Sequence, residues 1–135
     1  MKKEIFILII ISIFTVFIGC TNYQDEVIGT WNYQTFDTQP EGTVLWTFYD
    51  NGLLVRMNTS GSEIFYDSCE YVIDNSILKK KITFTGSSGI PGLVDINGLF
   101  RIDKLKDDIL VMTRIRLPND ETAAAYLRCE MIRKH

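Results

Sequence analysis

From residue 27 onward, apolar and polar residues alternate in short runs that turn residues separate. Such alternation places successive side chains on opposite faces of a β-strand. Asp50-Asn51-Gly52 suits a tight hairpin turn, because Asn and Gly tolerate positive φ. Eight runs share the pattern and are predicted to be strands: 27–37, 43–49, 53–58, 63–73, 77–85, 99–105, 109–117 and 122–133.

Eight short strands with mostly short connections predict an all-β fold. The expected architecture is a single antiparallel eight-stranded meander closed into a β-barrel, with a flattened sandwich as the alternative. No run predicts a convincing helix. Residues 123–125 are three alanines, but Ala125, Leu127, Cys129 and Met131 continue the period of two, which favours a strand.

Large apolar side chains recur on one face of these strands and are expected to face the barrel interior. An eight-stranded barrel is wide enough either to be filled by side chains or to hold one small ligand. Both alternatives fit this sequence. The expected inward residues are Trp46, Phe48, Met57, Phe65, Tyr71, Phe84 and Phe100. The candidates to contact a ligand are Trp46, Phe48, Met57, Tyr71 and Phe84.

The segment from Gly86 to Gly98 is longer than an ordinary hairpin connection and contains four glycines and Pro91. It is a candidate lid or partner-binding loop, and an insertion without a role is the alternative. Exposed apolar side chains at its tip would favour a protein partner. The residues concerned are Ile90, Leu93 and Val94.

The start of the chain has a different pattern. Lys2 and Lys3 precede an apolar run over residues 5–18, which ends at Gly19-Cys20. These are the features of a secretory signal peptide. An uncleaved membrane anchor is the alternative, but as a helix this run rises only ~21 Å, against a hydrocarbon core of ~30 Å.

Phe17-Ile18-Gly19-Cys20 resembles the lipobox of bacterial lipoproteins. The resemblance implies cleavage before Cys20 and attachment of lipid, such as palmitate, to that cysteine. It divides the chain into a signal peptide (1–19), an acylated cysteine with a polar tether (20–26) and a barrel domain (27–135). It also implies a lipoprotein of the outer membrane, on its periplasmic or surface-exposed face.

Val27-Ile28-Gly29-Thr30-Trp31 resembles the Gly-x-Trp opening of lipocalins, and the wider pattern is similar to small lipocalin-like lipoproteins of Bacteroidetes. The resemblance implies that Gly29 lets the chain pass close under the barrel and that Trp31 plugs its closed end. Lipocalins also pack a late basic residue over this tryptophan, and Arg128 and Arg133 both compete for that role. The chain has no clear Thr-Asp-Tyr motif and no helix after the last strand, so the resemblance is to lipocalin-like proteins.

Composition argues against several function classes. Without residues 1–19 the net charge is near −4 and no basic stripe remains, so nucleic acid is not an expected partner. His135 is the single histidine, which leaves no Ser–His or Cys–His pair and no usual zinc site. Asp67 and Glu70 lie on opposite faces of one strand and cannot act together. We therefore expect no enzymatic activity, no cofactor and no metal.

Cys69 and Cys129 form an even pair once Cys20 carries lipid. They are a candidate disulfide in an oxidising compartment. The alternative is two free cysteines that behave as small buried hydrophobes.

Taken together, these features predict a lipid-anchored cell-envelope lipoprotein whose lipocalin-like barrel binds a small apolar ligand. The alternative is a non-enzymatic protein-interaction module that uses residues 86–98. An inhibitor or an accessory subunit of a surface complex would be such a module.

Overall fold

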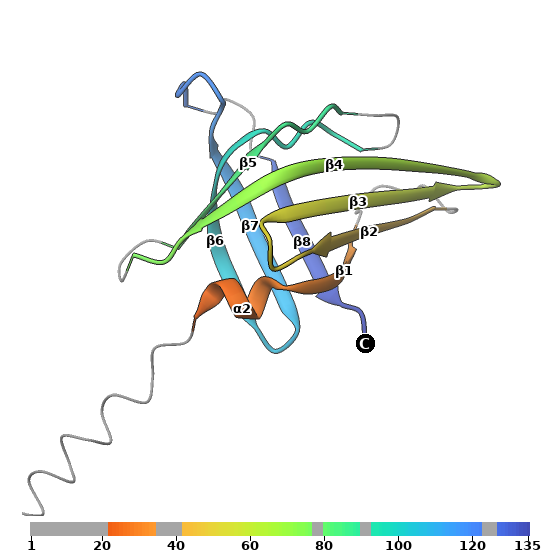
Figure 1. Ribbon diagram of the computed structural model, residues 1–135, viewed down its shortest axis with the longest axis horizontal. Helices are drawn as coiled ribbons and strands as arrows, with labels where there is room; N and C mark the ends of the chain where they lie inside the picture. The colour runs from red at the N-terminus through yellow and green to blue at the C-terminus, as the bar shows by residue number, and fades with distance from the viewer. Residues whose placement is uncertain (1–21, 35–41, 77–79, 90–92, 123–126) are drawn as a thin grey trace, which may run out of the picture.

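The computed structural model describes residues 22–34, 42–76, 80–89, 93–122 and 127–135 of the chain. They form a closed antiparallel barrel in which each strand pairs with the next and β1 pairs with β8 (Figure 1). This confirms the predicted eight-stranded meander. The strands are β1 (Gly29–Tyr33), β2 (Gly42–Phe48), β3 (Leu53–Ser60), β4 (Glu63–Asp74), β5 (Lys81–Thr85), β6 (Gly98–Lys106), β7 (Ile109–Arg116) and β8 (Arg128–Arg133).

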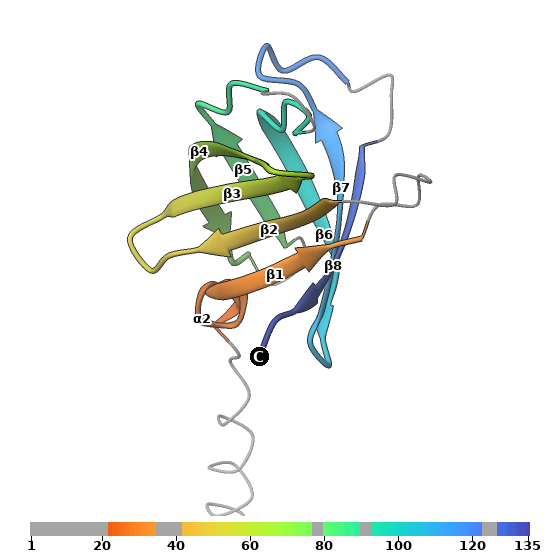
Figure 2. The same ribbon diagram turned by 90° about the vertical axis from the view of Figure 1, so that its right-hand side faces the viewer.

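The two ends of the barrel are built differently (Figure 2). Successive turns of a meander alternate between the ends, so the β2–β3, β4–β5 and β6–β7 turns share one end. Helix α2 (Tyr23–Val27) and the C-terminus also lie at this end, which we call the closed end. The β5–β6 connection and the β7–β8 turn lie at the opposite end, which we call the open end.

Helix α2 lies mostly within the segment predicted to be a polar tether and ends at Val27, the residue from which strands alone were predicted. The side chain of Asn22 caps it by accepting a hydrogen bond from the backbone N–H of Gln24 at 3.3 Å. Val27, predicted to open the first strand, instead ends this helix and is fully buried in the core. A helix of five residues is too short to show a 3.6-residue apolar period, so the sequence pattern missed it.

Strand β3 faces the opposite way from the prediction, which placed Met57 inside the barrel. The buried, inward residues are Leu54, Arg56 and Asn58, whereas Met57 is half-buried on the outer surface. Leu54 pairs with Phe48 and Arg56 with Trp46, and both partners face inward. Because side chains alternate with a period of two, this register decides the face of the whole strand.

The other inward positions agree with the prediction. Cys69, Tyr71, Phe84 and Phe100 are buried, as are Trp46 and Phe48 of β2, and Phe65 is half-buried on the inner side of β4. Residues 1–21 lie outside the described residues, and with them the signal peptide and Cys20. In the part of the chain that is described, no helix has the length and apolar character needed to cross a bilayer.

Candidate binding sites at the open end of the barrel

Trp31 lies at the closed end and is fully buried. Its indole N–H donates to the carbonyl of Val27 at 2.8 Å. The guanidinium carbon of Arg133 lies 4.2 Å from the ring centroid, within the range of a cation–π contact. Gly29 has φ +128°, and a Cβ there would meet Nη1 of Arg133 at 2.8 Å. The absence of a side chain at Gly29 therefore lets Arg133 reach the tryptophan.

Arg133 is held by main-chain acceptors on several sides. Its Nη1 donates to the carbonyl of Ile28 at 2.9 Å, and its Nη2 donates to the carbonyl of Glu26. Its Nε donates to Asp108 in the β6–β7 turn at 3.1 Å. Of the two basic residues that the resemblance left open, Arg133 packs over Trp31, and Arg128 points outward to Glu130. The indole N–H of Trp31 and each guanidinium nitrogen of Arg133 therefore have an acceptor.

The part of the barrel interior nearer the closed end is filled by aromatic side chains. The rings of Phe84 and Phe100 meet edge to face with centroids 5.3 Å apart, and those of Phe48 and Tyr71 with centroids 5.1 Å apart. Phe48 also contacts Phe84 and Trp46. Such contacts add to the stability that burial itself provides. Four of the five residues predicted to contact a ligand therefore pack against one another, and the fifth, Met57, faces outward.

A buried ion pair lies above this aromatic core, near the open end. Arg56 on β3 is fully buried, and its Nε and Nη2 both donate to one carboxylate oxygen of Asp67 on β4. The guanidinium also lies 5.3 Å from the ring centroid of Trp46. A buried charge needs such partners, because removing it from water is costly.

The ion pair holds down the connection between β5 and β6, which we call the strap (residues 86–97, of which 86–89 and 93–97 are described). Nη1 of Arg56 donates to the carbonyl of Val94 at 2.8 Å, and Nη2 donates to Oγ of Ser87 at 2.8 Å. Ser88 donates to Asp67 from both its N–H and its hydroxyl. The strap is therefore bonded to the barrel wall at both of its described parts.

The strap is less exposed than the prediction required for a partner-binding tip. Leu93 and Ile96 are buried against the barrel, whereas Val94 is 57% exposed. Ile90 lies outside the described residues. Of the three apolar residues named for a protein partner, Leu93 is thus part of the packing, because the bonds of the strap to Arg56 and Asp67 pull this part of the chain inward.

These bonds change the acidity of Asp67. Burial raises the pKa of this carboxyl, but hydrogen bonds from Arg56, Ser88 and Ser87 outweigh burial and lower the pKa from 3.8 to about 2. Asp67 is therefore a carboxylate at any physiological pH, and the ion pair with Arg56 is permanent.

Trp46 lies beside this ion pair, and Arg114 on β7 is bonded to the strap. Nη1 of Arg114 donates to the carbonyl of Asp95 in the strap at 3.0 Å. Tyr33 stacks on Trp46 with ring centroids 5.6 Å apart, and burial raises the pKa of its hydroxyl, as does the neighbouring Cys129. Two buried N–H groups have no hydrogen-bond acceptor within the described part of the chain: Nε1 of Trp46 and Nε of Arg114.

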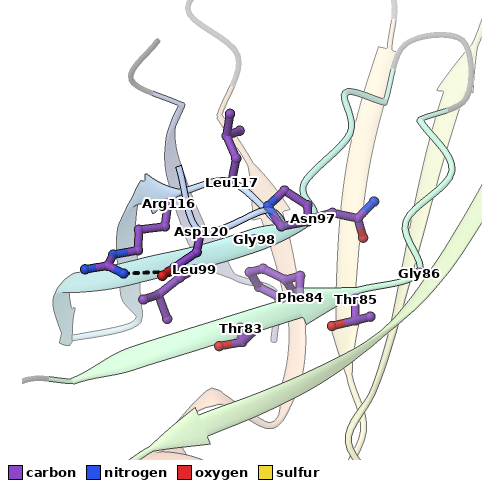
Figure 3. A pocket seen from close by; sticks show the side chains of 11 residues that line it. Thr83, Phe84, Thr85, Gly86, Asn97, Gly98, Leu99, Arg116, Leu117 and Asp120 are labelled. Carbon is purple, nitrogen blue, oxygen red and sulfur yellow. Dashed lines mark hydrogen bonds and ion pairs between the residues drawn. The ribbon is translucent and has the colours of Figure 1, made fainter. Parts of the chain in front are cut away.

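A groove of about 520 Å³ lies at the rim of the open end, between the ends of β5, β6 and β7 and the turn that follows β7 (Figure 3). We call it the rim groove. Leu99, Leu117 and Pro118 supply its apolar surface, and Thr83, Thr85 and Asn97 supply hydrogen-bonding groups. Arg116 and Asp120 form an ion pair of 2.5 Å at its edge.

Gly98 shapes the rim groove at its floor. Its φ is +122°, and a Cβ there would overlap the carbonyl oxygen of Arg116. Only glycine lets β6 begin this close to the end of β7.

The two inner cysteines are both free and buried, so the candidate disulfide is not formed. Cys69 lies on β4 and Cys129 on β8, and these strands stand on opposite walls of the closed barrel. Burial raises the pKa of each thiol to about 12. Within the described residues, no group of three or more His, Cys, Asp and Glu side chains could hold a metal ion.

Sequence reasoning missed Arg56 and Arg114 as interior residues. An arginine inside an apolar-alternating strand reads as an outward residue, because a buried charge is rare without a partner. The available signal was Asp67, which interrupts the apolar face of β4. A carboxylate at an inward position indicates a buried cation nearby, and Arg56 pairs directly opposite it.

No family model matches the chain, and no curated protein matches it.

Proposed function

We propose that this chain is a non-enzymatic lipoprotein of the cell envelope, anchored through acylated Cys20, whose lipocalin-like barrel binds a small molecule with an apolar part. The rim groove is the observation that carries the binding proposal. Its volume of about 520 Å³ lies within the range typical of small-molecule sites. Its mixture of leucine and threonine side chains suits a ligand that is apolar over most of its surface.

The geometry of the barrel favours the rim over the deep interior as the place of binding. Phe48, Tyr71, Phe84 and Phe100 occupy the volume that a deep ligand would need. The closed end is bonded through Trp31 and Arg133, so access from that side would cost these contacts.

Native mass spectrometry of the full chain, extracted gently from its own host in detergent, tests the binding proposal. We expect a co-purifying small mass that denaturation removes. Thr83→Trp would fill the groove with an outward side chain and should abolish that mass. Thr43→Trp is the matched control, since Thr43 is an exposed outward residue of β2 away from the groove. A bound mass that survives Thr83→Trp would exclude the rim groove.

Fractionation tests the anchor separately. Palmitate labelling should be lost in Cys20→Ser, and the variant should leave the membrane fraction. The anchor proposal fails if Cys20→Ser is still labelled. Protease treatment of intact cells then distinguishes a surface-exposed protein from one that faces the periplasm.

A protein-interaction module is the second candidate function, and an exposed apolar surface outside the barrel favours it. Ile64 and Tyr66 on β4 are 55% and 61% exposed. Tyr66 lies across from Met57, and Met57 lies across from Leu45, so three strands contribute to one outer row. Cross-linking in host cells that Tyr66→Glu abolishes, with no change after Thr83→Trp, would favour this candidate.

A further inference from the structure

The two charged residues that line the rim groove neutralise each other. Arg116 and Asp120 are these residues, and Nη1 of Arg116 donates to Asp120 at 2.5 Å. Asp120 follows Arg116 by four residues on the same chain, so it competes for the guanidinium at a high effective concentration. Among the described residues, the groove therefore offers no unpaired charge to a ligand.

A charged ligand would gain little from this arrangement. An anion would have to displace Asp120 from Arg116, and a cation would have to displace Arg116 from Asp120. Each exchange replaces one exposed ion pair by another, and exposed pairs contribute little. The charge of the ligand would also lose hydration as it enters the groove. Electrostatics therefore favours an uncharged ligand.

The hydrogen-bonding groups that remain in the groove are hydroxyls. Thr83 and Thr85 both point outward from β5, about 7 Å apart along the strand. Within the described part of the chain, neither hydroxyl forms a hydrogen bond. The amide of Asn97, by contrast, donates to the carbonyl of Ser87 at 2.7 Å and accepts from its N–H at 2.8 Å. A threonine hydroxyl both donates and accepts, so it suits a hydroxyl or a carbonyl of a ligand.

The apolar surface of the groove lies across from these threonines. Figure 3 shows Thr83 and Thr85 on β5 and Leu117 on the segment after β7, with the start of β6 between them. Leu99 is half-buried on β6 and lies directly opposite Thr83 in the sheet. A ligand in the groove would therefore meet hydrogen-bonding groups along one side and apolar groups along the other.

We infer that the ligand of the rim groove is an uncharged amphiphile. Its hydroxyl or carbonyl group bonds to the two threonines of β5, and its apolar body packs on Leu99, Leu117 and Pro118. The pair of Arg116 and Asp120 selects against charged ligands because each residue already holds the other. This inference rests on the proposed function, since it names the chemical class of the ligand of the same groove.

Three probes with the same six-carbon chain test the charge of the ligand: 1-hexanol, hexanoate and hexylamine at neutral pH. Methyl carbon-13 NMR spectra of the full chain in lipid nanodiscs report binding through the signals of Leu99 and Leu117. Leu45, on the outer face of β2 and outside the groove, is the internal control. Free probe concentrations are measured after dialysis, because each probe also enters lipid. We expect 1-hexanol to shift Leu99 and Leu117 to saturation, and both charged probes to bind about tenfold more weakly.

Threonine-to-valine variants test the hydrogen bonds. Thr83→Val keeps the shape of the side chain and removes its hydroxyl, so 1-hexanol should bind several-fold more weakly. Thr43→Val changes an exposed threonine of β2 outside the groove and should leave binding unchanged. An unmoved Leu45 signal shows that each variant is folded.

The ion pair gives a reciprocal test. Asp120→Asn leaves Arg116 without its partner, so hexanoate should bind this variant about tenfold more tightly than the wild type. Arg116→Gln leaves Asp120 without its partner, so the same gain is expected for hexylamine. A gain of each charged probe in its own variant would show that the pair selects against charge.

The inference is overturned if the wild type binds hexanoate or hexylamine as tightly as 1-hexanol, or if Thr83→Val binds 1-hexanol as tightly as Thr43→Val does. These results would leave the groove itself in place as a binding site. Failure of all three probes to shift Leu99 and Leu117 would overturn the rim groove as a binding site, and the inference with it.

Discussion

Two arginine–tryptophan pairs lie inside this barrel, with Trp31 and Trp46 opposite each other on β1 and β2, but the polar groups of the two pairs are completed in different ways. At the closed end, Arg133 lies over Trp31, the indole N–H reaches a main-chain carbonyl, and the guanidinium reaches two more. On the neighbouring strands β2 and β3, Arg56 lies over Trp46, whose indole N–H has no acceptor among the described residues.

The difference lies in which polar groups find a partner within the protein. At the closed end, main-chain carbonyls and the Asp108 carboxylate accept from Trp31 and Arg133, beside a pocket of about 250 Å³. The buried carboxylate of Asp67 accepts from Arg56 and from the strap, whereas Nε1 of Trp46 and Nε of Arg114 have no acceptor among the described residues. The same kind of residue pair is therefore fully bonded around Trp31 and leaves an indole N–H without an acceptor at Trp46.

Loss of the buried carboxylate should have the largest effect on this comparison. Asp67→Asn leaves the Arg56 charge without its counter-ion, and we expect the free energy of unfolding to fall by about 3–5 kcal/mol. Asp120→Asn, which breaks the exposed pair with Arg116, is the control and should have a small effect. Urea denaturation measures both. Equal losses in the two variants would mean that the strap does not depend on the ion pair.

Acid should weaken the open end before the closed end. Because the pKa of Asp67 is about 2 in the folded state and 3.8 ordinarily, its contribution is present above pH 4 and lost as pH falls toward 2. The loss should be about 2 kcal/mol. Urea midpoints of the wild type and of Asp67→Asn should converge over this range. If the urea midpoints of the two proteins stayed equally far apart over this pH range, the lowered pKa of Asp67 would be contradicted.

The closed end can be tested by removing its cation. Arg133→Met keeps the apolar stem over Trp31 but loses the bonds to Ile28, Glu26 and Asp108, so we expect a loss of about 1–2 kcal/mol. Arg128→Met removes an exposed arginine of the same strand and should be milder. A smaller loss of stability for Arg133→Met than for Arg128→Met would contradict the stabilising role of Arg133.

The smallest effect should come from reducing agent. Cys69 and Cys129 are free, so dithiothreitol should leave the thermal midpoint unchanged, whereas a disulfide would contribute about 2–4 kcal/mol. Iodoacetamide should modify neither residue in the folded protein, because burial raises both pKa values to about 12, and should modify both in urea. A midpoint that falls on reduction would indicate a bridge.

Local patterns were sufficient for the strands and turns. Alternation in residues 43–49 and 63–73 predicted β2 and β4 and their inner faces, because a strand with one buried face must alternate. Asn51-Gly52 predicted the β2–β3 turn for a reason that lies within two residues. Helix α2 was not predictable in this way, since packing of Val27 against the core supports it and local periodicity does not.

The sequence by itself determined the all-β class, the number of strands and the position of Trp31 in the first of them, because these depend on patterns a few residues long. Only the tertiary structure decided which face of β3 is buried. Leu53, Val55 and Met57 are the more apolar set, yet pairing with β2 turns Leu54, Arg56 and Asn58 inward. A buried arginine is acceptable only where a partner from a distant strand meets it, and Asp67 does so once the barrel has closed.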